Sequence, residues 1–140
     1  MEISITRFIL AVAVTQVIHF VLIGLLYMNP LVAGWYKSFE KHPSMKNWES
    51  QGKFMMNMFF LTLVEIIFIG IVYVSTVQAL PNYFWMKGIV FGLLVAGVRV
   101  YPRFLSMYMQ TTYPGKLLAV EFVNGTIGCI IIGLGFSYFF

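Results

Sequence analysis

Charge is scarce in this sequence, and cysteine is almost absent. Asp, Glu, Lys and Arg make up only 10% of the 140 residues, whereas a soluble domain carries about 25%. The 60% hydrophobic content and the mean hydropathy of +0.86 indicate that the main solvent of the chain is lipid. The single cysteine, Cys129, excludes an intrachain disulfide and a cysteine-rich metal site.

The motifs of soluble catalysis and nucleotide binding are also missing. The sequence contains no GxGxxG, P-loop, HExxH, CxxC or GxSxG pattern. Haem ligation by two histidines needs a second histidine inside the membrane, but His42 lies in a loop, so only a symmetric dimer could pair two copies of His19. We therefore expect no enzyme activity, no cofactor and no metal site. The net charge of +4 does not by itself imply nucleic acid.

What the sequence does have is four long apolar stretches, each sufficient to cross a bilayer as a helix. Their ends coincide with turn signals at Asn29-Pro30, before Pro102, and at Tyr113-Pro114-Gly115. Strand-like alternation is lacking, so we predict an all-α polytopic membrane protein, a four-helix bundle forming a single transmembrane domain over residues 1–140. The expected spans are 8–28, 54–76, 84–101 and 116–139. The first is too long for a signal-peptide core and is expected to be retained.

Lysine and arginine are distributed unevenly between the two sides of this predicted bundle. The two loops on one side carry seven of them: Lys37, Lys41, Lys46, Lys53, Arg99, Arg103 and Lys116. The other side carries only Arg7 and Lys87. The bias predicts cytoplasmic basic loops and both termini on the outer side of the inner (plasma) membrane.

The segment between the first two spans, residues 29–53, is the only sizeable soluble piece. Lys37 and Lys41 are four residues apart, and so are Trp35 and Phe39. One interpretation is a short amphipathic helix on the inner membrane surface. The other is an ordered basic loop whose only role is topology.

Small residues recur every four positions in the last two spans. The third span has Gly88, Gly92 and Ala96, and the fourth has Gly125, Cys129 and Gly133. Lipid offers no hydrophobic drive between helices, so small residues mark close contacts. We expect these spans to pack on each other, with a dimer seam as the alternative. Cys129 is then a packing residue rather than a nucleophile.

Polar residues interrupt the predicted spans at two depths. At about 1.5 Å per residue, four of them lie about 12–18 Å from the inner edge, on three different helices. These candidate ligand- or proton-binding residues are Glu65, His19, Asn124 and Gln16. Arg99 and Glu121 lie nearer the inner edge and are expected to form an ion pair there.

Glu65 sits in the apolar run LTLVEIIFIG, where an unpaired charge is costly. We expect it to face His19, Asn124 or Gln16, either as a protonated acid or as an ion pair with His19. Arg99 is the alternative partner, at an estimated depth difference of about 9 Å. Such a cluster either binds a proton or ligand, or only fixes the register of the helices.

Two stretches, GLLYMNPLVAGWYKSF (24–39) and YPGKLLAVEFVNGTIGCIIIGLG (113–135), carry a resemblance. A first helix ends in Gly-x-x-Tyr before a proline, a Trp and a basic residue, and a glycine-rich last helix contains an Asn. The layout resembles a group of small four-helix bacterial membrane proteins classed as a domain of unknown function. This chain has Leu26-Tyr27 where that pattern usually has Trp-Tyr. The resemblance implies a fold and no activity.

Two functional hypotheses fit these features best. The first is a transport-type or ligand-binding bundle, expected to form a homo-oligomer, that uses the mid-membrane polar layer. The second is a non-catalytic accessory or anchoring subunit of a larger membrane complex. In both cases the lipid bilayer is the main surrounding partner.

Overall fold

The structure is a computed structural model that describes residues 4–46 and 48–140. Its elements are α1 (Ile5–Met28), α2 (Pro30–Ser38), α3 (Gln51–Thr76), the 3₁₀-helix η1 (Val77–Ala79), α4 (Phe84–Gln110) and α5 (Gly115–Phe139). Four helices are long and apolar enough to cross a membrane: α1, α3 with η1, α4 and α5. The prediction of an all-helical protein with four such helices is confirmed.

The breaks between helices follow local chemistry. The Asn29 side chain accepts a hydrogen bond from the Leu31 backbone N–H at 3.0 Å, and Pro30 opens α2 at a position where its missing N–H is not needed. Ser50 caps α3 by accepting from the Lys53 N–H at 3.2 Å. Because α2 ends at Ser38, Lys41 lies outside it.

The third span is longer than the sequence indicated. We expected it to end before Pro102, but α4 continues through this proline to Gln110. A proline removes one backbone hydrogen bond, and long membrane helices tolerate that loss. Residues 102–110 therefore extend the helix, and only a short link remains before α5.

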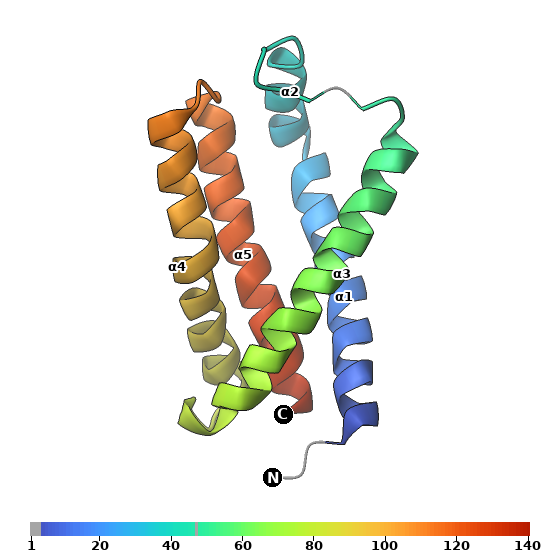
Figure 1. Cartoon of the computed structure of the whole chain (residues 1–140), viewed down its shortest axis with the longest axis vertical. Helices are drawn as coiled ribbons and strands as arrows, with labels where there is room; N and C mark the ends of the chain where they lie inside the picture. The colour runs from blue at the N-terminus through green and yellow to red at the C-terminus, as the bar shows by residue number, and fades with distance from the viewer. Residues whose placement is uncertain (1–3, 47) are drawn as a thin grey trace.

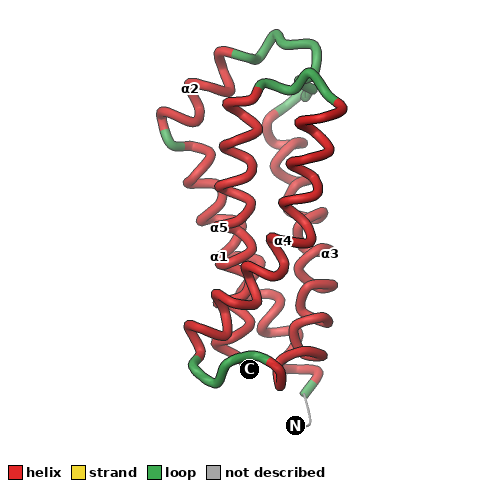
Figure 2. The backbone as a smooth tube through the Cα atoms, turned by 90° about the vertical axis from the view of Figure 1, so that its left-hand side faces the viewer, coloured by secondary structure: helices red, strands yellow, loops and turns green. Residues whose placement is uncertain are grey.

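Figure 1 shows how the helices are arranged. Helices α4 and α5 run side by side and antiparallel, and α1 packs on another side of α5. Helix α3 crosses the others obliquely, so that its lower end lies near α4 and α5 while its upper end diverges from them. The backbone seen from the side places α2 and the α4–α5 link at the upper end (Figure 2).

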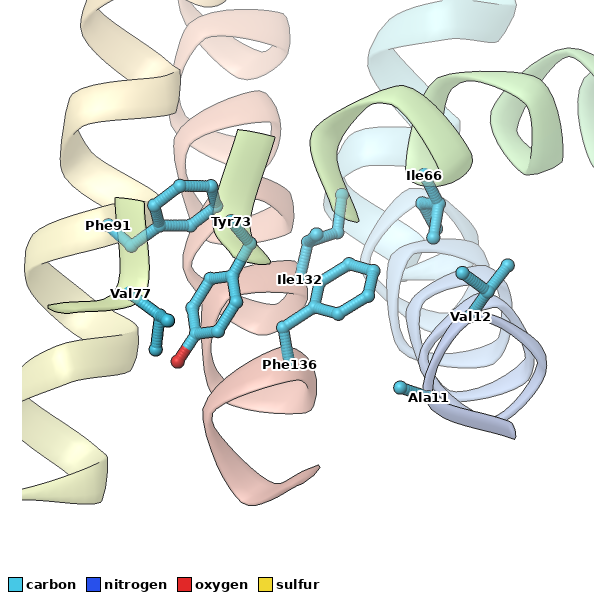
Figure 3. Close-up of a cluster of buried hydrophobic side chains, with 8 residues drawn as sticks. All are labelled: Ala11, Val12, Ile66, Tyr73, Val77, Phe91, Ile132 and Phe136. Carbon is cyan, nitrogen blue, oxygen red and sulfur yellow. The ribbon is translucent and has the colours of Figure 1, made fainter. Parts of the chain in front are cut away.

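The main core lies in the lower half of the bundle and draws on every long helix. Its buried residues are Ala11, Val12, Ile66, Tyr73, Val77, Phe91, Ile132 and Phe136. Tyr73 of α3 packs edge-on against Phe91 of α4 at 4.8 Å and stacks on Phe136 of α5 at 5.6 Å between ring centroids. Figure 3 shows Phe136 and Ile132 between Tyr73 and the α1 residues. We call this region the closed half.

The upper half is different. Helix α3 buries Ile66, Gly70 and Tyr73, and no residue N-terminal to Ile66 in that helix is buried. Here the second buried cluster contains only Ala96, Val100 and Cys129, all from α4 and α5. We call this region, from the level of Glu65 upward, the open half.

Candidate functional site

A charge pair lies at the boundary between the two halves. The Arg99 guanidinium donates to Glu65 with its Nη2 at 2.6 Å from Oε2, and Nε forms a second contact with Oε1. Two parallel contacts of this kind fix both distance and orientation. Glu65 lies fourteen residues from either end of the Gln51–Ala79 span, so the pair sits at mid-span. It joins α3 to α4 where the helices begin to diverge.

This pair is only partly covered. The side chains of Glu65 and Arg99 are 30% and 35% exposed. A carboxylate has about four lone-pair sites and a guanidinium has five N–H donors, so two contacts leave most of this capacity unused. Both charged groups therefore keep surface that the rest of the described chain does not cover.

The geometry corrects two expectations about ion pairs. Of the partners considered for Glu65, it is Arg99 that forms the contact, and Arg99 does not pair with Glu121. The reason is the length of α4. Arg99 lies eleven residues before the helix end at Gln110, which is about 16 Å of rise, so it is much deeper than an end at residue 101 implied.

Next to the pair lies Cys129 of α5, which is 1% exposed. The Arg99 Nη1 approaches its Sγ at 3.7 Å, a weak contact. The small thiol leaves room for the guanidinium at the α4–α5 interface.

Helix α1 contributes polar side chains at the same level. Gln16 is 1% exposed and donates through Nε2 to the Phe59 carbonyl at 2.9 Å and to the Thr62 hydroxyl at 3.0 Å. It therefore ties α1 to α3 one turn above Glu65 rather than contacting the carboxylate. His19 is 5% exposed and lies against Gly128 of α5, where an added Cβ would stand 3.1 Å from its Nε2.

Several buried polar atoms in this layer lack a hydrogen-bond partner in the part of the chain that the structure describes. They are Thr15 Oγ1, Gln16 Oε1, His19 Nδ1 and Asn124 Nδ2, with Tyr73 Oη in the closed half. Each such atom costs about 1–3 kcal/mol when left unsatisfied. Three of the four belong to α1 and one to α5, and a bound water or polar ligand group that reached any of them would be stabilising.

A second polar cluster lies near the upper end of α5, around Glu121. Its Oε1 accepts from Tyr113 at 2.5 Å and from Tyr36 at 3.4 Å, and its Oε2 receives Arg103 at 3.1 Å. Sequence reasoning missed the two tyrosines and assigned Arg103 only to topology. Continuing α4 through Pro102 would have placed Arg103 level with Glu121.

Burial raises the pKa of Tyr36, and the nearby Glu121 carboxylate raises it further. The pKa of Tyr113 is raised by burial first and then by its hydrogen bond and charge interaction with Glu121. Both hydroxyls therefore stay protonated well above neutral pH and act as donors to the carboxylate. The cluster anchors α2 and the α4–α5 link to α5.

The glycine rows lie between α4 and α5. A Cβ on Gly92 would stand 2.5 Å from the Ile130 Cα, and one on Gly88 would stand 2.7 Å from the Leu134 Cα. A Cβ on Gly133 would collide with the Gly88 carbonyl oxygen. Gly125 faces Val100 at 3.3 Å. The approaches at Gly88, Gly92 and Gly133 are to backbone atoms, and a larger residue blocks them, whereas Gly125 meets the Val100 side chain.

Among the residues that the structure describes, no group of three or more His, Cys, Asp or Glu is placed to hold a metal ion. Comparison with protein-family models, with curated proteins and with solved structures finds no match to this chain.

Proposed function

We propose that this chain is a transport-type or ligand-binding membrane bundle whose site is the Glu65–Arg99 pair, with His19 and Gln16 beside it. The ligand is a proton, an ion or a small amphipathic molecule. One observation carries the proposal: the charge pair lies at mid-span and both side chains remain about one third exposed. Ionisable residues at such depth are costly, and they commonly mark substrate or proton pathways.

The shape of the bundle supports access from one side. Above the pair, α3 buries no residue, while below it the aromatic cluster of Tyr73, Phe91 and Phe136 fills the space between helices. A ligand entering from the upper end meets the charges and then a packed barrier. This arrangement is similar to the conformation of an alternating-access transporter that is open to one side of the membrane.

The distribution of cations supports a cytoplasmic position for the open half. Arg99 lies within a span, so it does not count toward the positive-inside rule. Six cations remain at the upper end: Lys37, Lys41, Lys46, Lys53, Arg103 and Lys116. Arg7 and Lys87 lie at the other end. By the positive-inside rule, this bias supports an orientation with both chain ends outside. We propose that the membrane is the plasma membrane and that α2 lies at its inner surface.

Proton flux into vesicles tests the proposal. The purified chain is reconstituted in liposomes that contain a pH-sensitive dye, and an outside acid pulse is applied with potassium and valinomycin clamping the voltage. The wild type should acidify the lumen faster than empty vesicles, and Glu65→Gln should abolish the difference. Gln keeps an acceptor for Arg99, so this variant should retain its helix content.

Glu121→Gln is the matched control, because it makes the same change at the other carboxylate that pairs with an arginine. It should transport protons like the wild type. If wild-type vesicles acidify no faster than empty vesicles, proton transport is overturned. Equal loss in both variants, or loss of folded protein in Glu65→Gln, would favour a purely structural role for the pair.

A second candidate is an accessory subunit of a larger membrane complex, favoured by the upper part of α3. Met56, Phe60 and Leu61 are 60%, 58% and 67% exposed there, and a partner helix could cover them. Native mass spectrometry of the tagged chain, gently extracted from its own membranes, tests this. A stoichiometric foreign subunit would support it, and a monomer or homo-oligomer would count against it.

A further inference from the structure

A groove on the surface of α5 lies apart from the Glu65–Arg99 pair. It runs between α2 and α5, has a volume of about 430 Å³, and is lined by Val32, Trp35, Lys116, Ala119, Val120, Val123 and Asn124. This volume falls within the range of about 300–1,000 Å³ that is usual for small-molecule sites. Neither member of the mid-span pair lines it. The groove is thus a separate site, near the upper end of the bundle.

One end of the groove, which we call its mouth, is lined by the cationic residue Lys116. Lys116 lies in the first turn of α5, and among the described residues no carboxylate comes within 4 Å of its ammonium group. The residue before α5 is Pro114, which provides no side-chain cap. The first N–H groups of a 25-residue helix therefore lie beside an unpaired lysine. Free N–H groups and the helix dipole both favour an anion there.

The rest of the groove is apolar and extends along the helix. From Lys116 to Asn124 the distance along the α5 axis is about 12 Å. Between these residues the walls are the aliphatic side chains of Val32, Ala119 and Val123 and the indole of Trp35. Tryptophan is typical of the level where hydrocarbon meets headgroups. An anionic end at Lys116 and a single hydrocarbon chain below it match this pattern.

We propose that the groove between α2 and α5 binds an anionic phospholipid, with its phosphate at Lys116 and one acyl chain between Trp35 and Val123. The charge of the mouth selects an anionic headgroup over a zwitterionic one. The bound chain lies beneath α2, and α2 is tied to α5 by the Tyr36–Glu121 hydrogen bond at 3.4 Å. The bound lipid therefore packs between α2 and α5 and helps to hold α2 against α5.

Native mass spectrometry of the full chain in detergent tests this assignment. The sample is titrated with phosphatidylglycerol or with phosphatidylcholine of the same acyl chains. The wild type should retain one phosphatidylglycerol with about a tenfold preference, the size expected for one lysine plus a helix N-terminus. Lys116→Gln should bring the two lipids to near parity. Lys41→Gln, at an exposed loop lysine on the same side, should leave the preference unchanged.

Val123→Trp provides a second, independent variant, because a bulky side chain there fills the groove without changing charge. It should reduce binding of both lipids in protein whose circular dichroism matches the wild type. An equal effect of Lys116→Gln and Lys41→Gln would overturn the proposal in favour of general surface attraction. Retention of decanoate by the wild type as strongly as phosphatidylglycerol would overturn it in favour of a free fatty acid.

Discussion

The closed half and the open half of this bundle use the same four helices in opposite ways. In the closed half, all of them contribute to one aromatic and aliphatic cluster. In the open half, α3 diverges from α4 and α5 and stays in contact with α1. The buried apolar cluster there contains residues of α4 and α5 alone, and the other contacts between helices include ion pairs and hydrogen bonds. Apolar packing and polar contacts are therefore concentrated at different levels along the long axis of the bundle.

The contacts of the glycines follow this division in part, since Gly125 and Gly128 of the open half still face the Val100 and His19 side chains at 3.3 Å and 3.1 Å. A Cβ at Gly70, Gly88, Gly92, Gly133 or Gly135 would stand within about 3 Å of a neighbouring helix. At Gly24, Gly34, Gly52, Gly97 and Gly115 an added Cβ would meet nothing within 4 Å. Since lipid supplies no hydrophobic drive between helices, close packing is what holds the closed half. The glycines of the other group have no such task.

The largest expected effect comes from breaking the closed half at its tightest contact. Gly92→Val should destabilise the fold by about 3 kcal/mol, the upper end of the usual cost of overpacking, because its Cβ meets the Ile130 backbone, which cannot rotate away. Gly97→Val, on the same helix, should change stability by no more than about 0.5 kcal/mol. The fraction that stays monodisperse in size-exclusion chromatography after heating measures both. Similar losses in the two variants would refute the division of glycines.

A smaller effect is expected from removing an arginine at the boundary. Arg99→Gln leaves Glu65 unpaired at mid-span and should cost about 1–3 kcal/mol, below the 3–5 kcal/mol of a fully buried pair because both side chains are partly exposed. Arg103→Gln should cost no more than about 1 kcal/mol, since Arg103 is 66% exposed. Steric-trapping unfolding measurements in bicelles separate the two. A larger loss of stability in Arg103→Gln than in Arg99→Gln would contradict the placement of Arg99 as the deeper and less exposed of the two arginines.

The smallest effect concerns the tyrosines of the upper end. Their pKa values are raised above the usual value near 10, so their contribution to stability is complete below about pH 10 and declines as the pH rises toward the folded-state pKa. Tyrosinate absorbance during an alkaline titration should show late-titrating tyrosines in the wild type. Tyr113→Phe should remove one of them and cost about 1 kcal/mol. Ionisation of every tyrosine near pH 10 would contradict the buried cluster.

Local chemistry was sufficient to predict most helix boundaries. Asn29-Pro30 and Tyr113-Pro114-Gly115 separate helices as expected, because both act through the backbone of a few neighbouring residues. Pro102 has the same local chemistry but lies inside α4. One lost hydrogen bond is outweighed there by a continuous helix, and that balance depends on what surrounds the helix rather than on the dipeptide.

The candidate site was predicted in composition but not in pairing. Depth along each helix predicted that one layer holds Glu65, His19, Asn124 and Gln16. In the structure, Gln16 donates a hydrogen bond to α3 above Glu65, and the Glu65 carboxylate pairs with Arg99. Depth is a one-dimensional quantity. Which side chains face each other depends also on helix rotation and on the crossing of α3, and neither can be predicted from spacing within one helix.

The sequence by itself determined four apolar helices, their approximate bounds and the presence of charge inside them. These properties depend on run length, hydropathy and turn residues, which act within a segment. Only the tertiary structure decided that Arg99 meets Glu65, that Glu121 gathers Tyr36, Tyr113 and Arg103, and that one half of the bundle is closed. Such contacts join residues far apart in the chain, and they follow from how the helices cross and how closely glycine lets their backbones approach.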